Sequence, residues 1–129
     1  MWNPILECGR TLLDPGGLFT SPMYNTSMSG SAHGDRCEWR IVATHGETIV
    51  LNITDFDVPF SDGCKYDYLE IRDGYWHKSP LLARYCGPDL KFESSIISTG
   101  PRMLLTYITT HNSVGHRGFA ATYEGLFIS

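Results

Sequence analysis

Four widely separated cysteines are the feature that most constrains how this chain folds, and they are Cys8, Cys37, Cys64 and Cys86. No two of them form the closely spaced Cys-x-x-Cys pair that zinc ribbons and thioredoxin-like redox sites use. An even number of distant cysteines instead favours two disulfides, which form and persist in oxidising compartments outside the cytosol. Four cysteines allow three pairings, and their spacing does not choose among them.

Two N-glycosylation sequons point to the same compartment. They are Asn25-Thr26-Ser27 and Asn52-Ile53-Thr54, so Asn25 and Asn52 are candidate glycosylation sites in a secreted protein. The first residues lack the basic start and the apolar segment of a signal peptide. We therefore expect a module of a longer protein that is secreted or carries an ectodomain on the cell surface.

Composition limits the function classes open to the chain. Its 129 residues, 42% of them hydrophobic, are enough for one domain with one core. The net charge is −4 and no stretch collects the basic residues that nucleic-acid binding requires. No apolar run approaches the roughly 20 residues needed to cross a bilayer. We expect neither nucleic acid nor membrane insertion.

Short strand signals separated by turns dominate the sequence. Each predicted strand is rich in β-branched and aromatic residues and mostly alternates apolar with polar side chains. The predicted strands span residues 37–43, 48–56, 66–72, 81–85, 102–108 and 119–123. Gly, Pro, Asn and Asp lie between them, and no long segment keeps the 3.6-residue apolar period of a helix. The pattern predicts an all-β sandwich or barrel.

One segment resembles the signature of a known family, and five other segments resemble further parts of the same family in the same order along the chain. Residues 64–74 read CKYDYLEIRDG, a strand that begins at a cysteine and ends in a tight turn. The other segments are CG with GLFTSP (residues 8–9 and 17–22), CEW (37–39), LNITDF (51–56), YCG (85–87) and GFAATY (118–123). Together they resemble the CUB domain family from Cys8 to about Tyr123.

The resemblance implies a fold, a disulfide pairing and a location. The fold would be a jelly-roll-like, two-sheet antiparallel β-sandwich, with Cys8 joined to Cys37 and Cys64 to Cys86. We place the domain at residues 8–124, with flanks at 1–7 and 125–129. Residues 75–81 and 114–119 most resemble CUB modules of tolloid-type astacin metalloproteinases, while cubilin and neuropilin share much of the pattern. The module would be extracellular and non-catalytic.

Many CUB domains hold calcium through three acidic side chains, and this sequence keeps one of them clearly. Asp67 matches the middle position, but the first falls on Pro59 or Phe60 and the last on Thr110 or His111. Calcium prefers several carboxylate oxygens. We therefore expect no resident metal and no other cofactor, and at most weak calcium binding in which Asp62 or Asn112 could take part. Asp67 would otherwise hold the loops through hydrogen bonds to their amides.

No motif of a familiar enzyme is present. The five histidines, at positions 33, 45, 77, 111 and 116, do not form the His-Glu-x-x-His pair of a zinc protease, and the sequence has no nucleophile elbow. Asp55 and Asp57 flank Phe56 and could resemble an acid/base pair, but paired carboxylates are common on surfaces. The chain is expected to be a binding module, not an enzyme.

Aromatic residues placed in turns identify a candidate partner-binding surface. Its residues are Phe60, Tyr75, Trp76, His77 and Lys78. Tyr and Trp are enriched among binding hot spots, although Tyr75 or Trp76 could instead cap an open end of the sandwich. The expected partners are extracellular proteins of the matrix or of growth-factor pathways, recognised as substrates of a tolloid-type proteinase. The alternative is a receptor module that binds a ligand or co-receptor.

Overall fold

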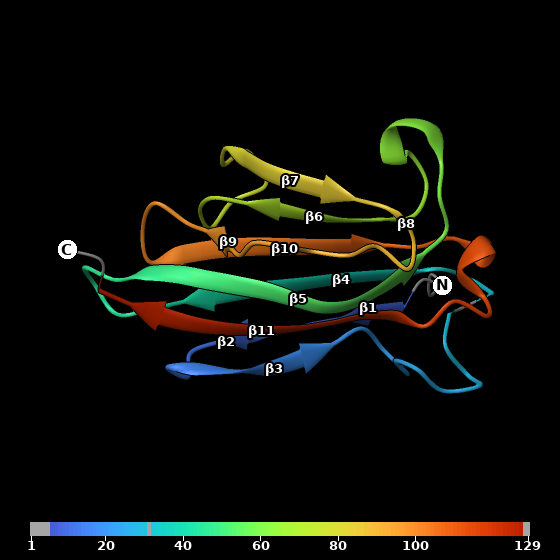
Figure 1. Ribbon diagram of the computed structural model, residues 1–129, viewed down its shortest axis with the longest axis horizontal. Helices are drawn as coiled ribbons and strands as arrows, with labels where there is room; N and C mark the ends of the chain where they lie inside the picture. Colours follow the sequence, from blue (N-terminus) through green and yellow to red (C-terminus); the bar gives the residue numbers. More distant parts are fainter. Residues whose placement is uncertain (1–5, 31, 128–129) are drawn as a thin grey trace, which may run out of the picture.

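Two β-sheets face each other in the computed structural model, which describes residues 6–30 and 32–127 (Figure 1). Sheet A has the order β1 (Leu6–Cys8), β4 (Asp35–Val42), β10 (Arg102–Ile108), β6 (Tyr68–Arg72) and β7 (Leu81–Tyr85), with β2 (Thr11–Leu12) also paired to β4. Sheet B has the order β3 (Gly16–Thr20), β11 (Gly118–Leu126), β5 (Thr48–Val58) and β8 (Gly87–Pro88), with β9 (Ile96–Ile97) also paired to β5. The all-β, two-sheet fold is confirmed.

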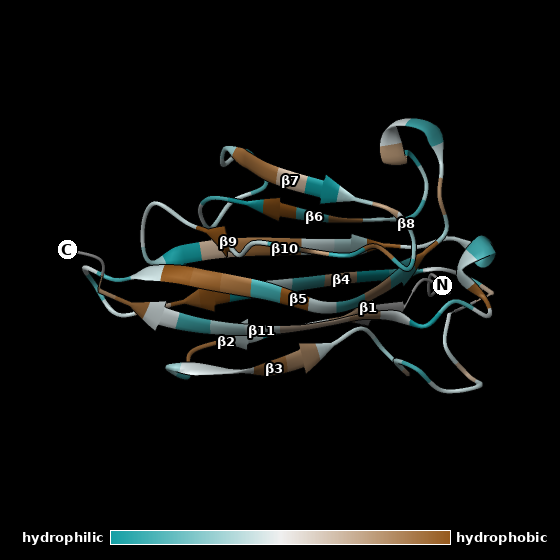
Figure 2. Cartoon of the chain, viewed as in Figure 1, coloured by the Kyte–Doolittle hydropathy of each residue, from teal (hydrophilic) through white to brown (hydrophobic). Residues whose placement is uncertain are grey.

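Alternating side chains decide which face of each strand is buried. In β4, Cys37, Trp39 and Ile41 are buried, while the residues between them are partly or fully exposed. The apolar stretches of β5 and β10 are visible in Figure 2. Because successive side chains of a strand point to opposite faces, this period of two places one face of each sheet in the shared core.

Four aromatic rings form the centre of the core. Phe119 lies 5.4 Å from Trp39, 5.1 Å from Tyr107 and 6.0 Å from Phe19, measured between ring centroids. The edge-to-face geometry of the Trp39 and Phe119 pair, at 86°, is favourable for aromatic rings. All four rings are buried, so they contribute a large share of the apolar area removed from water.

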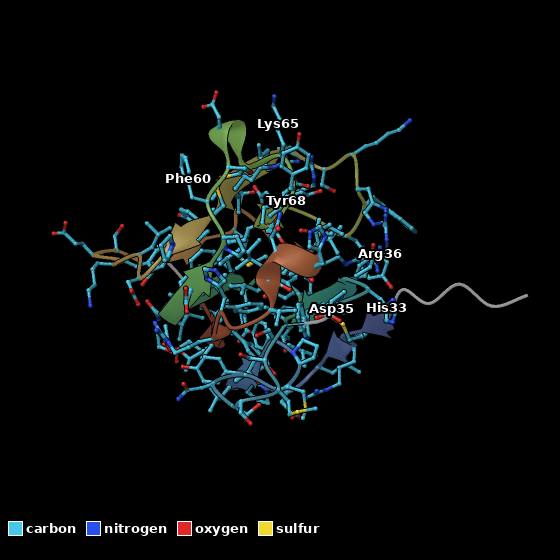
Figure 3. All side chains as sticks on the ribbon, turned by 90° about the vertical axis from the view of Figure 1, so that its right-hand side faces the viewer. His33, Asp35, Arg36, Phe60, Lys65 and Tyr68 are labelled. Carbon is cyan, nitrogen blue, oxygen red and sulfur yellow. A yellow bond between two sulfur atoms is a disulfide. The ribbon has the colours of Figure 1, made fainter. Side chains whose placement is uncertain are left out.

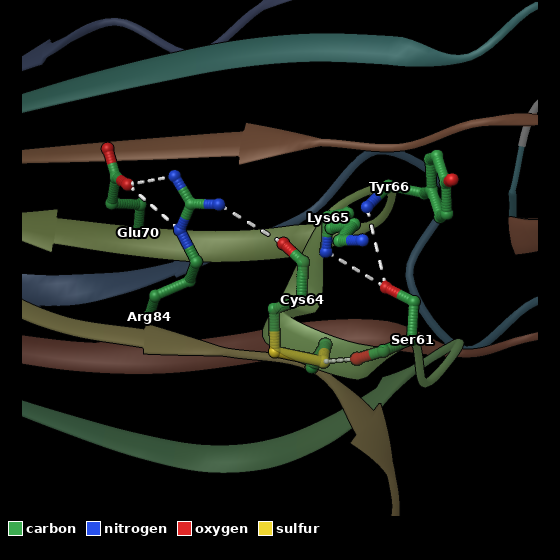
Figure 4. The surroundings of a disulfide bond; sticks show 7 residues. Ser61, Cys64, Lys65, Tyr66, Glu70 and Arg84 are labelled. Atoms are coloured by element: carbon green, nitrogen blue, oxygen red, sulfur yellow. Dashed lines mark hydrogen bonds and ion pairs between the residues drawn. A yellow bond between two sulfur atoms is a disulfide. The ribbon is translucent and has the colours of Figure 1, made fainter.

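Two disulfides cross-link the chain. Cys8 is joined to Cys37, its partner in the parallel β1–β4 register, and Cys64 is joined to Cys86. The second bridge ties η1 (Asp62–Cys64) to the end of β7, and Arg84 donates a hydrogen bond to the carbonyl of Cys64 beside it (Figure 4).

The strands that the sequence did not predict are short or rich in glycine. β3 contains Gly16 and Gly17, and β8 is only two residues long, so neither shows a local strand signal. β3 forms because it pairs with the longer strand β11, and β8 forms because it pairs with the longer strand β5. β1 and β2 pair with β4 in parallel, whereas the other pairings are antiparallel.

Both sequons lie on the surface. Asn25 is exposed in the β3–β4 connection, and Asn52 is exposed in the middle of β5, where its side-chain oxygen accepts a hydrogen bond from the Ser95 hydroxyl at 2.6 Å. Among the described residues, no helix has the length and apolar character that a bilayer crossing requires.

Candidate functional site

The β6–β7 loop, residues 73–80, is a tight and well-supported turn. The Asp73 amide donates to the Pro80 carbonyl at 2.8 Å, and the Ser79 amide donates to the Trp76 carbonyl at 2.9 Å. The Ser79 hydroxyl also accepts from the Trp76 amide at 3.1 Å. A side chain at Gly74 would meet Ser79 Oγ at 2.4 Å and require strained backbone at φ +149°, so glycine is needed there.

Tyr75 anchors this loop to sheet A. Arg40 Nε donates to the Tyr75 carbonyl at 2.8 Å, and the Arg40 guanidinium lies 4.7 Å from the centre of the Tyr75 ring. The Arg102 guanidinium approaches the same ring at 5.7 Å. Such cation–π contacts stabilise a partly exposed ring. Tyr75 thus holds the loop 73–80 against sheet A.

Trp76 packs against Tyr75 and projects into solvent. Its ring meets Tyr75 edge-on at 4.9 Å, yet the residue is 65% exposed. Tyr75 and Trp76 line a hollow of about 340 Å³ together with Thr99, Pro101 and Arg102. A large apolar ring that is held by a neighbouring ring on one side and exposed to solvent on the other can bury area against a partner at low entropic cost.

His77 extends the site toward β4 of sheet A. His77 Nε2 lies 2.5 Å from Glu38 Oε2, and Arg40 Nη1 donates to Glu38 Oε1 at 3.1 Å. Partial burial works against ionisation, but the hydrogen bonds from His77 and Arg40 prevail and hold the pKa of the Glu38 carboxyl below its usual value. Lys78 is exposed next to His77, so the predicted group 75–78 forms one continuous surface.

Phe60 does not belong to that surface, and the prediction of a single surface is corrected here. Residues 59–67 precede β6 and residues 73–80 follow it, so the two loops lie at opposite ends of the strand (Figure 1). Phe60 is 72% exposed at the end of the molecule that faces the viewer in Figure 3. Loops that precede and follow the same strand lie at its opposite ends, because each residue of a strand advances the chain by about 3.3 Å.

Asp67 is buried at the Phe60 end, and its carboxylate accepts hydrogen bonds from the neighbouring loop. The Thr110 amide donates to Asp67 Oδ1 at 2.6 Å and the Thr110 hydroxyl donates to Oδ2 at 3.0 Å. Thr110 also caps η2 (His111–Ser113) by accepting from the Asn112 amide. Asp67 therefore fastens the η2 loop to sheet A.

The residues at this end are a poor match for a tight calcium site. Within residues 6–30 and 32–127, no three Asp, Glu, His or Cys side chains gather where they could share a metal ion. Calcium is usually bound by several carboxylate and carbonyl oxygens, and here Thr110 or His111 falls at one expected acidic position. The hydroxyl of Thr110 bonds to the remaining carboxylate in a way that a second acid could not.

Asp55 and Asp57 form an ion-pair cluster around Arg117. The Arg117 guanidinium donates to both oxygens of Asp55, at 3.1 and 2.9 Å, and the Arg117 amide donates to Asp57 at 2.9 Å. Tyr24 donates to Asp55, and His116 Nδ1 lies 2.8 Å from Asp57. Hydrogen bonding by Arg117 is the main reason why the pKa of Asp55 falls to about 2. Neither carboxyl has the raised pKa of a general acid.

Asp55 makes stability depend on acid pH in a defined direction. Because its pKa is lower in the folded state, its contribution is present above about pH 4 and lost as the pH falls toward 2. We expect Asp55→Asn to lower the free energy of unfolding by about 1 kcal/mol at pH 7, after allowance for partial exposure. In urea titrations the difference between the two proteins should shrink between pH 4 and pH 2. Exposed Asp62→Asn is the control, and a difference that stays constant with pH would refute this role.

Sequence comparisons agree with this architecture. The CUB domain family matches residues 8–123. Bone morphogenetic protein 1 of Xenopus laevis is 45% identical over 92% of this chain and 16% of its own length, and human tolloid-like protein 1 is 44% identical over 92% and 11%. Pig cubilin is 32% identical over 92% of this chain and 3% of its own length. The chain thus spans a small part of these relatives.

Solved structures show the same fold at lower identity. The CUB1-EGF-CUB2 region of rat MASP-1 superimposes with a TM-score of 0.76 at 20% identity, covering 94% of this chain and 44% of that one. The MASP-1 CUB2 domain bound to Ca²⁺ gives 0.70 at 22% identity, covering 89% and 96%. The two-sheet fold, the sequence match along almost the whole chain and the relatives together identify the protein as an extracellular CUB domain, a non-catalytic module, of the kind found in bone morphogenetic protein 1 and the tolloid-like proteins.

Proposed function

We propose that this CUB domain selects and positions protein substrates for the catalytic domain of a tolloid-type metalloproteinase. The substrates would be matrix proteins or growth-factor antagonists. CUB domains mediate protein–protein interactions, and the similarity to bone morphogenetic protein 1 and the tolloid-like proteins favours this parent over a receptor. Binding remote from the scissile bond raises the effective concentration of substrate at the active site.

The observation that carries the proposal is the supported, exposed Trp76. Its loop is fixed by Arg40, which also contacts Tyr75, so the ring is presented without first having to be ordered. Truncation of such an aromatic anchor commonly costs 2 kcal/mol or more of binding free energy. Phe60 offers a second exposed ring, but none of the described cation–π or ring contacts involves it.

The function is tested by competition. A mixture of extracellular proteins is digested with human tolloid-like protein 1, with and without an excess of the isolated CUB domain. If the domain recognises substrates, it should bind some of them and slow their cleavage, whereas cleavage of a short synthetic peptide, too small to reach the domain, should not change. Quantitative mass spectrometry of the cleavage products measures both.

Two results would count against substrate recognition. The first is that the domain in excess leaves every protein cleavage unchanged. The second is that Trp76→Ala, once shown to melt like the parent, slows cleavage as strongly as the unaltered domain. Slower cleavage of the short peptide would indicate inhibition of the protease itself, which the proposal does not include.

We further propose that the Phe60 end keeps its shape without calcium and binds the ion weakly at most. A tight site saturated a hundredfold would add about 2.7 kcal/mol, or about 10 °C in melting temperature for a domain of this size. We expect millimolar calcium to raise the melting temperature by less than about 2 °C, because Asp67 is already bonded to Thr110. A rise of many degrees that Asp67→Asn abolishes would show that the loops form a calcium site.

A further inference from the structure

The outer face of sheet A carries five of the ten basic residues of the chain. Among the residues whose side chains the structure describes, the outward-facing charged residues of its strands are the arginines Arg36, Arg40, Arg72, Arg84 and Arg102 and the glutamates Glu38 and Glu70. This face therefore has an excess of positive charge in a chain whose net charge is −4. Such an uneven distribution attracts anions to one side of a protein that repels them elsewhere.

Two of these arginines, Arg36 and Arg40, line a groove beside β4 together with Arg10. The groove has a volume of about 280 Å³ and is lined by Cys8, Arg10, Thr11, Arg36, Glu38 and Arg40. Arg40 is committed to Glu38 and Tyr75, but Arg10 and Arg36 make no ion pair with any other described side chain and are exposed. Two guanidinium groups are thus available on the walls of one groove.

The spacing of the arginines suits a repeating anion. The Arg40 amide donates to the Arg10 carbonyl at 3.2 Å, so Arg10 lies beside Arg40, four residues along β4 from Arg36. The backbones of Arg10 and Arg36 are therefore about 13 Å apart along the strand direction. A single phosphate or carboxylate cannot bridge that distance, whereas a chain with regularly spaced anionic groups can. Guanidinium groups bind sulfate and carboxylate oxygens through paired, charge-assisted hydrogen bonds.

The lining distinguishes a sulfated sugar chain from an acidic peptide. Protein partners gain most of their binding energy from aromatic or aliphatic anchors in apolar pockets. Apart from Cys8 and the hydrocarbon parts of its polar residues, the groove offers no such pocket. We infer that this groove, between Arg10, Arg36 and Arg40, is a binding site for a sulfated glycosaminoglycan. The groove adjoins the aromatic surface of the proposed function through Glu38 and Arg40, but Trp76 does not line it.

Heparin is a suitable probe for this site. The intact domain should bind heparin in isothermal titration calorimetry at low salt, and the affinity should fall steeply between about 0.05 M and about 0.5 M NaCl. Arg36→Ala and Arg10→Ala should each weaken binding about tenfold. Lys91→Ala removes the same charge from an exposed loop residue and is the matched control, expected to change binding less than twofold.

Glu38 gives a change in the opposite direction. Its side chain lines the groove and binds Arg40, so Glu38→Gln removes a negative charge from the groove and should strengthen heparin binding. Each variant must first melt like the parent protein. Trp76→Ala should bind heparin normally, which separates this inference from the proposed function.

Three outcomes would overturn the inference. The intact domain could fail to bind heparin at low salt. Lys91→Ala could weaken binding as much as Arg36→Ala, which would show a response to total charge alone. Polyglutamate of similar length could bind as tightly as heparin and lose affinity in the same variants, which would assign the groove to acidic peptides.

Discussion

Replacing Cys64 and Cys86 together by alanine is expected to lower the free energy of unfolding by about 3 kcal/mol. The two cysteines are 22 positions apart, and the bridge restricts the unfolded chain over that loop. In the folded state it also fixes η1 beside β7, where Arg84 bonds to the Cys64 carbonyl. A domain of this size is commonly stable by about 5–15 kcal/mol, so the loss is a large share of the total.

Urea titration followed by tryptophan fluorescence measures this effect. The Cys8→Ala, Cys37→Ala pair should lose a similar amount, since its sequence separation is 29. The unaltered domain in reducing agent serves as the control and should become at least as unstable as either double variant. A loss below about 1 kcal/mol, or a Cys37–Cys64 link in non-reducing peptide mapping, would contradict the disulfide assignment.

Phe119→Ala is the second large effect that we expect, with a loss of about 3–5 kcal/mol. The side chain is fully buried and its ring contacts Trp39, Tyr107 and Phe19, so its removal leaves a cavity that rigid neighbouring rings cannot fill. The cost combines lost transfer free energy with the cavity itself.

Phe127→Ala is a matched control for this change. It deletes the same ring from a residue that follows β11 and is 71% exposed, so it should cost less than about 1 kcal/mol. Thermal and urea denaturation of the two variants give the comparison. Equal losses, or a loss below about 1 kcal/mol for Phe119→Ala, would mean that Phe119 does not lie in the core.

The sequence predicted the parts of the fold that are encoded locally. Alternation in residues 37–43 predicted a strand with one buried face, and Trp39 lies on that face, where it is 2% exposed, because such a strand repeats every two residues. It could not indicate β3, whose glycines have little strand propensity and which pairs only with the distant β11. Likewise, no local signal connects Arg117 with Asp55, which are 62 positions apart.

The candidate site was predicted less completely than the fold. Composition identified Trp76 and Phe60 as aromatics in turns, but did not separate the two ends of the sandwich. The docking of the loop 73–80 depends on Arg40 and Glu38, which lie on a neighbouring part of sheet A and carry no local mark of this role. In the sequence, the only sign of this contact was that β4 has a charged residue at every second position, Arg36, Glu38 and Arg40. That pattern indicates a strand with one face toward solvent, and it does not indicate a contact with the loop 73–80.

The central claim is that this CUB domain binds proteins through the β6–β7 loop and not through the Phe60 end. Surface plasmon resonance tests it with a substrate protein whose cleavage the domain slows. Trp76 and Phe60 are similarly exposed, at 65% and 72%, so Trp76→Ala and Phe60→Ala are a balanced pair. We expect Trp76→Ala to raise Kd about thirtyfold and Phe60→Ala to change it less than about twofold. Unchanged affinity for a correctly folded Trp76→Ala, together with a large loss for Phe60→Ala, would contradict the claim and place the binding surface at the opposite end.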